Sequence, residues 1–190
     1  MRYQVVCAGI GGRGVLLAST ILIETAIAGG YEARASDEYG MSQRGGSVVS
    51  LIKVGDFKSP LVGRESADAL LAFEESEFFR NIAFLRRGAV VVVNGKEEDL
   101  RSSVRLMLTE RSIGYYPVDA DGIAAELGSP QASNMAVLGV FACVAGEPFS
   151  FGAVGNMIRQ KKSGRLAEKN YEVFQKGYDF ARNRYECKPL

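Results

Sequence analysis

The apolar residues of the chain fall into short blocks that favour alternating strands and helices. An apolar run at 2–8 predicts a first strand, and residues from Gly14 to about Ala28 predict a helix that ends at Gly29-Gly30. The continuous apolar run at 89–94 is typical of a central strand buried on both faces. Further strands are predicted at 31–35, 46–54, 68–74 and 114–120, with 57–62 as a hairpin partner of 46–54.

Helical patterns lie between these strands and dominate the last third of the chain. Residues 133–146 are apolar on nearly every face, which predicts a buried helix. In 165–185 the apolar residues recur mostly three or four apart, which predicts an amphipathic C-terminal helix that packs on the domain. Asp119 is predicted to cap a helix over 120–128. The remaining helices are predicted at 76–87 and 97–110.

This alternation predicts an α/β fold for a single domain that spans residues 1–190. Strands that alternate with helices typically form a mostly parallel sheet covered on both faces, so we predict a three-layer α/β/α sandwich. The first strand, the glycine-rich turn and the first helix form a Rossmann-like βα unit. The region 46–62 is expected to add antiparallel strands.

The composition excludes several kinds of function. The 190 residues are 47% hydrophobic and carry a net charge of +1, which gives no electrostatic basis for binding nucleic acid or an anionic membrane. The chain contains no histidine, which removes histidine-based triads and imidazole metal ligands. The N-terminus shows no signal-peptide pattern, and the most apolar helix is short and contains Glu24. We therefore predict a soluble, cytoplasmic chain.

The three cysteines point away from a cluster site. Cys7, Cys143 and Cys187 are too few for the four thiolates that an iron–sulfur cluster usually takes. Cys7 and Cys143 lie in apolar runs and are predicted to be buried, whereas Cys187 lies in a polar tail and carries no clear signal. We predict no metal site in this chain.

The glycine-rich turn GIGGRG at 9–14 raises one alternative function. Gly9, Gly11 and Gly14 match the dinucleotide-binding pattern G-x-G-x-x-G, and Asp37 falls where a ribose-binding acid is expected. A free-standing NAD(P)-dependent oxidoreductase therefore stays open. The additional Gly12 and the absence of an evident hydride-transfer partner weaken it. A tight turn without a ligand, in a non-catalytic interaction module, is the second alternative.

A polar segment, SDEYGMSQRGG at 36–46, sets the chain apart from an ordinary dinucleotide-binding fold. With the turn GIGGRGV, its run GMSQRGGSV resembles the small subunit of 2-oxoacid:ferredoxin oxidoreductases, called gamma or, in the indolepyruvate enzymes, beta. That family carries G-x-G-G-Q-G-V near the N-terminus, and its indolepyruvate branch carries G-M-x-Q-R-G-G-S-V. Similar matches at 59–77, 126–140 and 168–178 extend the resemblance over nearly the whole chain.

The resemblance implies a supporting subunit of an enzyme. The complex would oxidatively decarboxylate a 2-oxoacid, an aryl pyruvate such as indolepyruvate, to an acyl-CoA and pass the electrons to ferredoxin. Thiamine diphosphate, iron–sulfur clusters and coenzyme A would be used through a larger partner subunit, with no cofactor bound by this chain alone. The isolated chain is expected to be inactive and to form a homodimer through surfaces meant for the partner.

Two departures from the family pattern bear on the substrate. Arg13 stands where the family usually has glutamine, and Tyr39 stands where the indolepyruvate branch often has histidine. The exchange at Tyr39 is expected to change the substrate if that position touches the 2-oxoacid. Residues 37–44 are expected to need a partner for order, because the segment is polar and rich in glycine.

The candidate site residues surround the turn and the polar segment. Arg44 suits a carboxylate or phosphate, because a guanidinium binds such groups through a bidentate fork. The alternative that Arg44 braces the segment against Asp37 or Glu38 is equally open. We assign no catalytic residue to this chain. The residues predicted to face the substrate, coenzyme A or the partner subunit are Gly11, Gly12, Arg13, Gly14, Tyr39, Met41, Gln43, Arg44, Gly45, Gly46, Glu74 and Asn134.

Three of these assignments have structural alternatives. Glu74 is also consistent with a solvated acid at a helix start, where the helix dipole favours it. Asn134 and its neighbour Ser133 are good helix caps, and we expect at least one of them to cap. Tyr39 and Met41 are equally consistent with an apolar contact to the partner, because aromatic residues and methionine are enriched in interfaces.

Overall fold

A computed structural model describes residues 1–40, 46–161 and 164–187 of the chain. In this part the chain forms a six-stranded sheet and seven α-helices. The strands are β1 (Tyr3–Ile10), β2 (Ala33–Tyr39), β3 (Ser47–Val54), β4 (Ala67–Ala72), β5 (Leu85–Asn94) and β6 (Gly114–Val118). The helices are α1 (Val15–Ala28), α2 (Glu75–Asn81), α3 (Ser102–Glu110), α4 (Ala120–Glu126), α5 (Ser133–Ala145), α6 (Phe151–Lys161) and α7 (Arg165–Arg184).

The sheet is mixed, with strand order β2-β3-β1-β4-β5-β6. Strands β1, β4, β5 and β6 pair in parallel, whereas β3 pairs antiparallel with both β1 and β2. Five strands therefore run one way and β3 alone runs against them, which confirms the mostly parallel α/β fold. The insertion of β3 between β1 and β2 distinguishes this βα unit from a Rossmann unit, in which the strand after the first helix pairs with the first strand.

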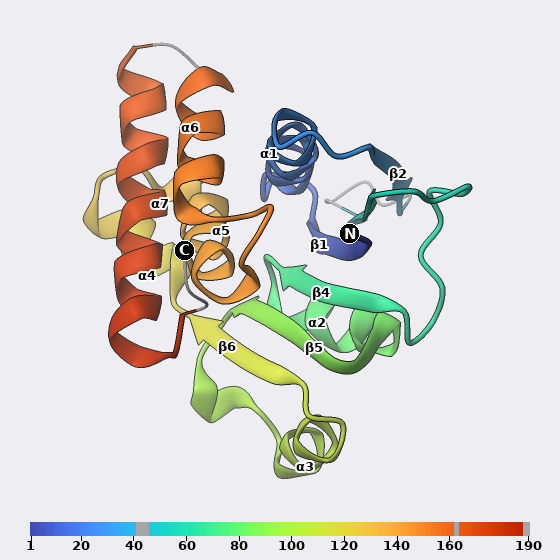
Figure 1. Cartoon of the computed structure of the whole chain (residues 1–190). Coiled ribbons are helices and arrows are strands. Elements are labelled where there is room, and N and C mark those ends of the chain that lie inside the picture. Colours follow the sequence, from blue (N-terminus) through green and yellow to red (C-terminus); the bar gives the residue numbers. More distant parts are fainter. Residues whose placement is uncertain (41–45, 162–163, 188–190) are drawn as a thin grey trace.

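The helices cover both faces of the sheet (Figure 1). Helices α1, α5, α6 and α7 pack on one face around a large apolar core that includes Leu22, Phe141 and Phe174. Helix α2 and the smaller α3 pack on the other face, around a core that includes Phe78. All of α5 is buried, as its apolar pattern predicts, since α7 shields it from solvent. Among the described residues, no helix combines the length and apolar character that a membrane span needs.

Two predictions about the strands are wrong. No strand lies at 57–62, and the antiparallel partners of β3 are β1 and β2. Pro60 lacks the N–H that a strand ladder needs, which helps explain the first difference. The first residues of the polar segment, 36–39, belong to β2, because Ser36 pairs with Leu51 and Tyr39 pairs with Val48. These residues thus have a hydrogen-bonded partner strand within the chain, while 41–45 lie outside the described residues.

Several predicted helix limits also differ. The helix predicted at 76–87 ends at Asn81, and a short 3-10 turn (Ile82–Phe84) leads into β5. The helix predicted at 97–110 is a 3-10 turn (Glu97–Asp99) followed by α3. Helix α6 is absent from the sequence predictions. Asp119 caps α4 as predicted, since its Oδ1 accepts a 2.8 Å hydrogen bond from the Gly122 backbone N–H.

The cysteines are arranged in a way that the sequence did not predict. Cys143 in α5 and Cys187 in the tail form a disulfide, with 4.7 Å between their Cα atoms. Cys7 is free and fully buried in β1, and burial followed by the charge of Asp37 raises the pKa of its thiol. The prediction that Cys7 and Cys143 are buried is confirmed.

A thiol titration checks this arrangement. We expect the unreduced native chain to give no fast reaction with a thiol reagent, because Cys7 is buried and protonated. Unfolding in denaturant without reductant should expose one thiol, and prior reduction should expose all three cysteines. Three reactive thiols in the unreduced, unfolded chain would contradict the disulfide.

Candidate functional site

The glycine-rich turn connects the carboxyl end of β1 to α1. Gly14 is the N-cap of α1 with φ +71°, a left-handed conformation that glycine adopts without steric cost. The Arg13 N–H donates to the Ile10 carbonyl at 3.1 Å and closes the turn. The Gly11 N–H donates to the Gly46 carbonyl at 3.0 Å. The turn is therefore joined directly to the end of the polar segment.

Arg13 is the centre of a polar cluster at the carboxyl edge of the sheet. Its Nε–H donates to Glu74 Oε1, and its Nη1–H donates to Asp121 Oδ1 at 2.8 Å. Asn94 Nδ2–H donates to Asp121 Oδ2 at 3.0 Å, and Asn94 Oδ1 accepts the Ala120 backbone N–H at 3.0 Å. These four side chains, Arg13, Glu74, Asn94 and Asp121, form the Arg13 cluster. It connects the ends of β1, β4 and β5 to the first turn of α4.

The charge of Arg13 is balanced within the chain. Partial burial disfavours the guanidinium charge, but Asp121 and Glu74 outweigh burial and raise the pKa of Arg13. The side chain remains 32% exposed, so the cluster lies at the surface of the sheet edge. A phosphate that approached this turn would meet a cation already paired with two carboxylates. The cluster therefore argues against pyrophosphate binding at Arg13.

Glu74 and Asn134 do not act as simple helix-terminal residues. Glu74 is the N-cap residue of α2, but its side chain pairs with Arg13 and makes no capping hydrogen bond. Asn134 lies in the first turn of α5 and donates from Nδ2 to the Gly14 carbonyl at 3.1 Å. The N-cap of α5 is Ala132, without a side-chain capping bond. The expectation that Ser133 or Asn134 caps this helix is therefore wrong.

A buried carboxylate anchors Ser47, the residue that directly follows the polar segment. Glu77 in α2 has 1% of its side chain exposed and accepts a 2.7 Å hydrogen bond from Ser47 Oγ. Arg80 and Asn81 complete its partners. The Gly40 N–H donates to the Ser47 carbonyl at 2.7 Å, so the end of β2 and the start of β3 are hydrogen-bonded to each other. The predicted residues between them, Met41, Gln43, Arg44 and Gly45, lie outside the described residues.

The other side of the turn is an apolar depression of about 480 Å³. Tyr39, at the end of β2, is 60% exposed and lies over it beside Leu16 of α1. The depression is lined by Ile10, Gly11, Gly12, Gly14, Val15, Leu16, Tyr39 and Val48. The turn thus separates a polar cluster from an apolar surface.

The structure gathers the described candidate residues around one turn. Gly11, Gly12, Gly14 and Tyr39 line the depression, Gly46 and Asn134 bond to the turn, and Arg13 pairs with Glu74. Sequence reasoning missed Asn94, Asp121 and Glu77. The position of Asn94 directly after an apolar strand was the available signal, because ligands of α/β proteins lie beyond the carboxyl ends of strands.

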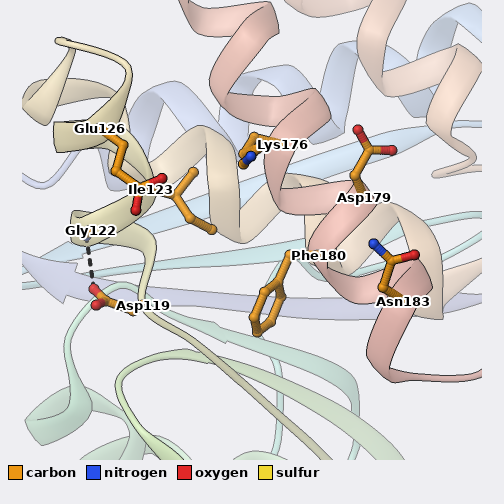
Figure 2. Close-up of a pocket in the computed structure, with 8 residues that line it drawn as sticks. All are labelled: Asp119, Gly122, Ile123, Glu126, Lys176, Asp179, Phe180 and Asn183. Carbon is orange, nitrogen blue, oxygen red and sulfur yellow. Dashed lines mark hydrogen bonds between the residues drawn. The ribbon is translucent and has the colours of Figure 1, made fainter.

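A separate groove of about 390 Å³ runs between α4 and α7 (Figure 2). Ile123 and Phe180 provide its apolar part, and Lys176 and Asp179 project from α7. Asp119 lies at one end, where it holds the Gly122 N–H. None of the predicted site residues lines this groove.

The strand order, the helices on both faces and the braced turn define a three-layer α/β domain. The chain belongs to the pyruvate ferredoxin/flavodoxin oxidoreductase family, whose sequence model matches residues 4–180. The resemblance stated from the sequence motifs is thereby confirmed, as is the placement of the chain among subunits of 2-oxoacid:ferredoxin oxidoreductases.

Individual relatives support the same placement. The indolepyruvate oxidoreductase subunit IorB of Archaeoglobus fulgidus is 29% identical over 95% of this chain and 96% of its own length. The ketoisovalerate oxidoreductase subunit VorA of Methanothermobacter marburgensis is 30% identical over 96% of this chain, which spans 37% of that protein. Among solved structures, the gamma subunit of a keto/oxoacid ferredoxin oxidoreductase from Geobacter sulfurreducens matches with TM-score 0.73 and 25% identity. That match covers 95% of this chain and 99% of the other.

Proposed function

We propose that this chain is the small, cluster-free subunit of a 2-oxoacid:ferredoxin oxidoreductase that acts on an aryl pyruvate such as indolepyruvate. The observation that most supports this proposal is the end-to-end match to an indolepyruvate oxidoreductase subunit, which leaves almost no part of either chain unmatched. In the proposed reaction a 2-oxoacid and coenzyme A give an acyl-CoA and carbon dioxide, and two electrons pass to ferredoxin. The complex would work in the cytoplasm.

The side chains of this subunit do not fit an iron–sulfur cluster. Such a cluster takes four thiolates, and the chain has three cysteines, of which Cys143 and Cys187 are paired and Cys7 is buried. Within the described residues, no group of three or more cysteines or carboxylates could hold a metal ion. The proposal therefore assigns the clusters and thiamine diphosphate to a larger partner subunit.

The turn and the polar segment are proposed to form the wall that faces that partner. Of the two arginines among the candidate residues, Arg13 is engaged by Glu74 and Asp121. We therefore assign contact with the 2-oxoacid carboxylate or a coenzyme A phosphate to Arg44, with Gln43 beside it. Tyr39, exposed at the same edge, is the residue proposed to adjust the choice of 2-oxoacid.

Purification from the native source tests the proposed function. We expect this chain to copurify with a larger, brown, thiamine-dependent subunit, and the complex to reduce ferredoxin when supplied with an aryl pyruvate and coenzyme A. Pyruvate and 2-oxoglutarate serve as comparison substrates. Recovery of this chain without such a subunit, or tight NAD(P)H binding by the isolated chain, would reject the proposal. The second outcome would favour the NAD(P) alternative. Two contacts oppose that alternative: Arg13 is paired with Asp121, and Asp37, at the position of the ribose-binding acid, accepts a 2.6 Å hydrogen bond from Ser50 Oγ.

The role of Arg44 has its own test. In the reconstituted complex, Arg44→Ala is expected to raise the KM for the 2-oxoacid or coenzyme A about tenfold or more, because a charge-assisted bidentate contact is lost. Arg64→Ala removes another exposed arginine and is the matched control. Unchanged kinetics with intact assembly would show that Arg44 does not contact either substrate.

A further inference from the structure

Strand β2 forms an open edge of the sheet. It is the terminal strand, and of its seven residues five are exposed, among them Arg34, Ala35 and Glu38. An edge strand directs half of its backbone N–H and C=O groups away from its neighbour, where another strand can pair with them. No backbone hydrogen bond to that open side is present among the described residues. We propose that a second copy of this chain pairs antiparallel with β2 and extends the two sheets into one.

In one register, the charged residues of β2 face residues of opposite charge on β2 of the second copy. A two-fold axis perpendicular to the sheet through Ser36 places Arg34 opposite Glu38 of the second copy, and Glu38 opposite Arg34. It also places Ala35 opposite Asp37 of the second copy. The seam therefore contains two opposite-charge pairs and no like-charge pair. Cross-strand pairs of this kind stabilise antiparallel ladders, and like charges directly opposite destabilise them.

The neighbouring registers are unfavourable. A two-fold axis perpendicular to the sheet keeps the helices of both copies on the same faces of the joined sheet. Side chains that lie opposite each other across the seam therefore point to the same face, and the axis must pass through a residue. An axis through Ala35 would bring Glu32 opposite Glu38 of the second copy. An axis through Asp37 would bring the two Asp37 carboxylates together. The sequence of the strand thus selects Ser36 as the centre.

Helix α1 supplies apolar surface beside the open edge. Leu16, Ile23 and Ile27 recur at spacings of seven and four residues and share one face of the helix. Leu16 and Ile27 are exposed, with Ile27 at 53%. Leu16 lines the same depression as Tyr39, the last residue of β2. Figure 1 shows α1 over the β1–β2 side of the sheet.

The side chains that would form the ion pairs are both exposed. Arg34 is 54% exposed, and its partner within the chain is Glu32 at the long distance of 3.8 Å. Glu38 is exposed. A seam of seven residues is small beside the roughly 800 Å² per partner of a stable interface, so the dimer should be weak, with Kd on the order of micromolar.

Sedimentation of the full chain, followed by exchange of the two charges, tests the pairing. Wild type should show a concentration-dependent monomer–dimer equilibrium. Arg34→Glu and Glu38→Arg should each weaken the dimer roughly tenfold to hundredfold, because each change creates two like-charge pairs. An equimolar mixture of the two variants should recover the dimer, since every facing pair is then opposite in charge. Arg182→Glu, at an exposed position of α7 away from β2, is the control and should leave the equilibrium unchanged.

The mixing experiment distinguishes loss of the charge pairs from loss of the fold, because mixing would not repair a fold defect in either variant. A monomeric wild type, single variants that remain dimeric, or a mixture that stays monomeric would each overturn the proposal. Protection of β2 from hydrogen exchange only after addition of the larger subunit would also overturn it, and would assign the strand to that partner. The inference does not depend on the proposed enzymatic function.

Discussion

Replacing Gly139 with alanine is expected to lower the free energy of unfolding by about 3 kcal/mol, at the upper end of the cost of overpacking a core. The reason lies in the crossing of α5 and α7. A Cβ on Gly139 would overlap the Phe174 carbonyl oxygen and come within 2.6 Å of the Tyr178 backbone nitrogen. Both are backbone atoms of a long helix, so no side-chain rotation can relieve the contact.

The opposite face of the same crossing carries a second glycine. A Cβ on Gly177 would come within 2.7 Å of the Ala136 Cα atom. Gly177→Ala is therefore expected to cost a similar amount, and the double variant should cost less than the sum, because one separation of the helices relieves both contacts. Alanine favours a helix by up to about 1 kcal/mol over glycine, which offsets only part of the strain.

Helix α6 offers a matched control for these variants. A Cβ on Gly152 would meet nothing within 4 Å, so Gly152→Ala should be neutral or stabilise the chain by up to about 1 kcal/mol. Urea unfolding of the oxidised chain, followed by circular dichroism, compares the wild type with these four variants. Equal unfolding midpoints for Gly139→Ala and Gly152→Ala would contradict the tight crossing of α5 and α7.

Replacing Arg13 with alanine should have the largest effect on activity. The change leaves Glu74 and Asp121 without their shared cation and removes the anchor between the glycine-rich turn and α4. The pairs are partly exposed, so we expect a loss of about 1–2 kcal/mol in stability, between the values for surface and buried pairs. If the turn faces the reacting partner as proposed, its displacement should lower kcat/KM of the reconstituted complex about ten- to hundredfold.

Two further variants show which property of Arg13 matters. Arg13→Lys keeps the charge but lacks the planar fork that bonds two carboxylates, so it should recover only part of the loss. Arg105→Ala removes an exposed arginine that lies 3.2 Å from Glu97 and should change stability by less than about 0.5 kcal/mol. If Arg13→Ala behaves like Arg105→Ala in both unfolding and turnover, the cluster does not hold the turn.

Local patterns predicted the elements whose form depends on nearby residues. The apolar run at 89–94 forms the C-terminal part of β5, and the apolar pattern at 133–146 corresponds to the fully buried α5 (Ser133–Ala145). The spacing in 165–185 predicted α7 to within one residue. The cap at Asp119 is a local signal as well, because its partner, Gly122, lies three residues away. Each of these signals is contained in one short stretch of chain.

The pairing of β2 was not predictable in this way. The polar sequence of residues 36–39 reads as a loop, yet β3 holds them in the sheet as an edge strand. An edge strand exposes much of its surface, so it carries little of the apolar alternation that marks a strand buried on one face. Strand β3 thus pairs with β2, which precedes it in the chain, and not with residues 57–62, which follow it.

The sequence by itself determined the α/β class, the glycine-rich turn, the buried and amphipathic helices and, through two short motifs, the family. Only the tertiary structure decided how the candidate site is built. Arg13 meets Asp121 across 108 residues of chain, Gly14 meets Asn134 across 120, and Cys143 meets Cys187 across 44. Such contacts depend on which strands become neighbours and how helices cross. The packing of the whole core settles both, and no local pattern records them.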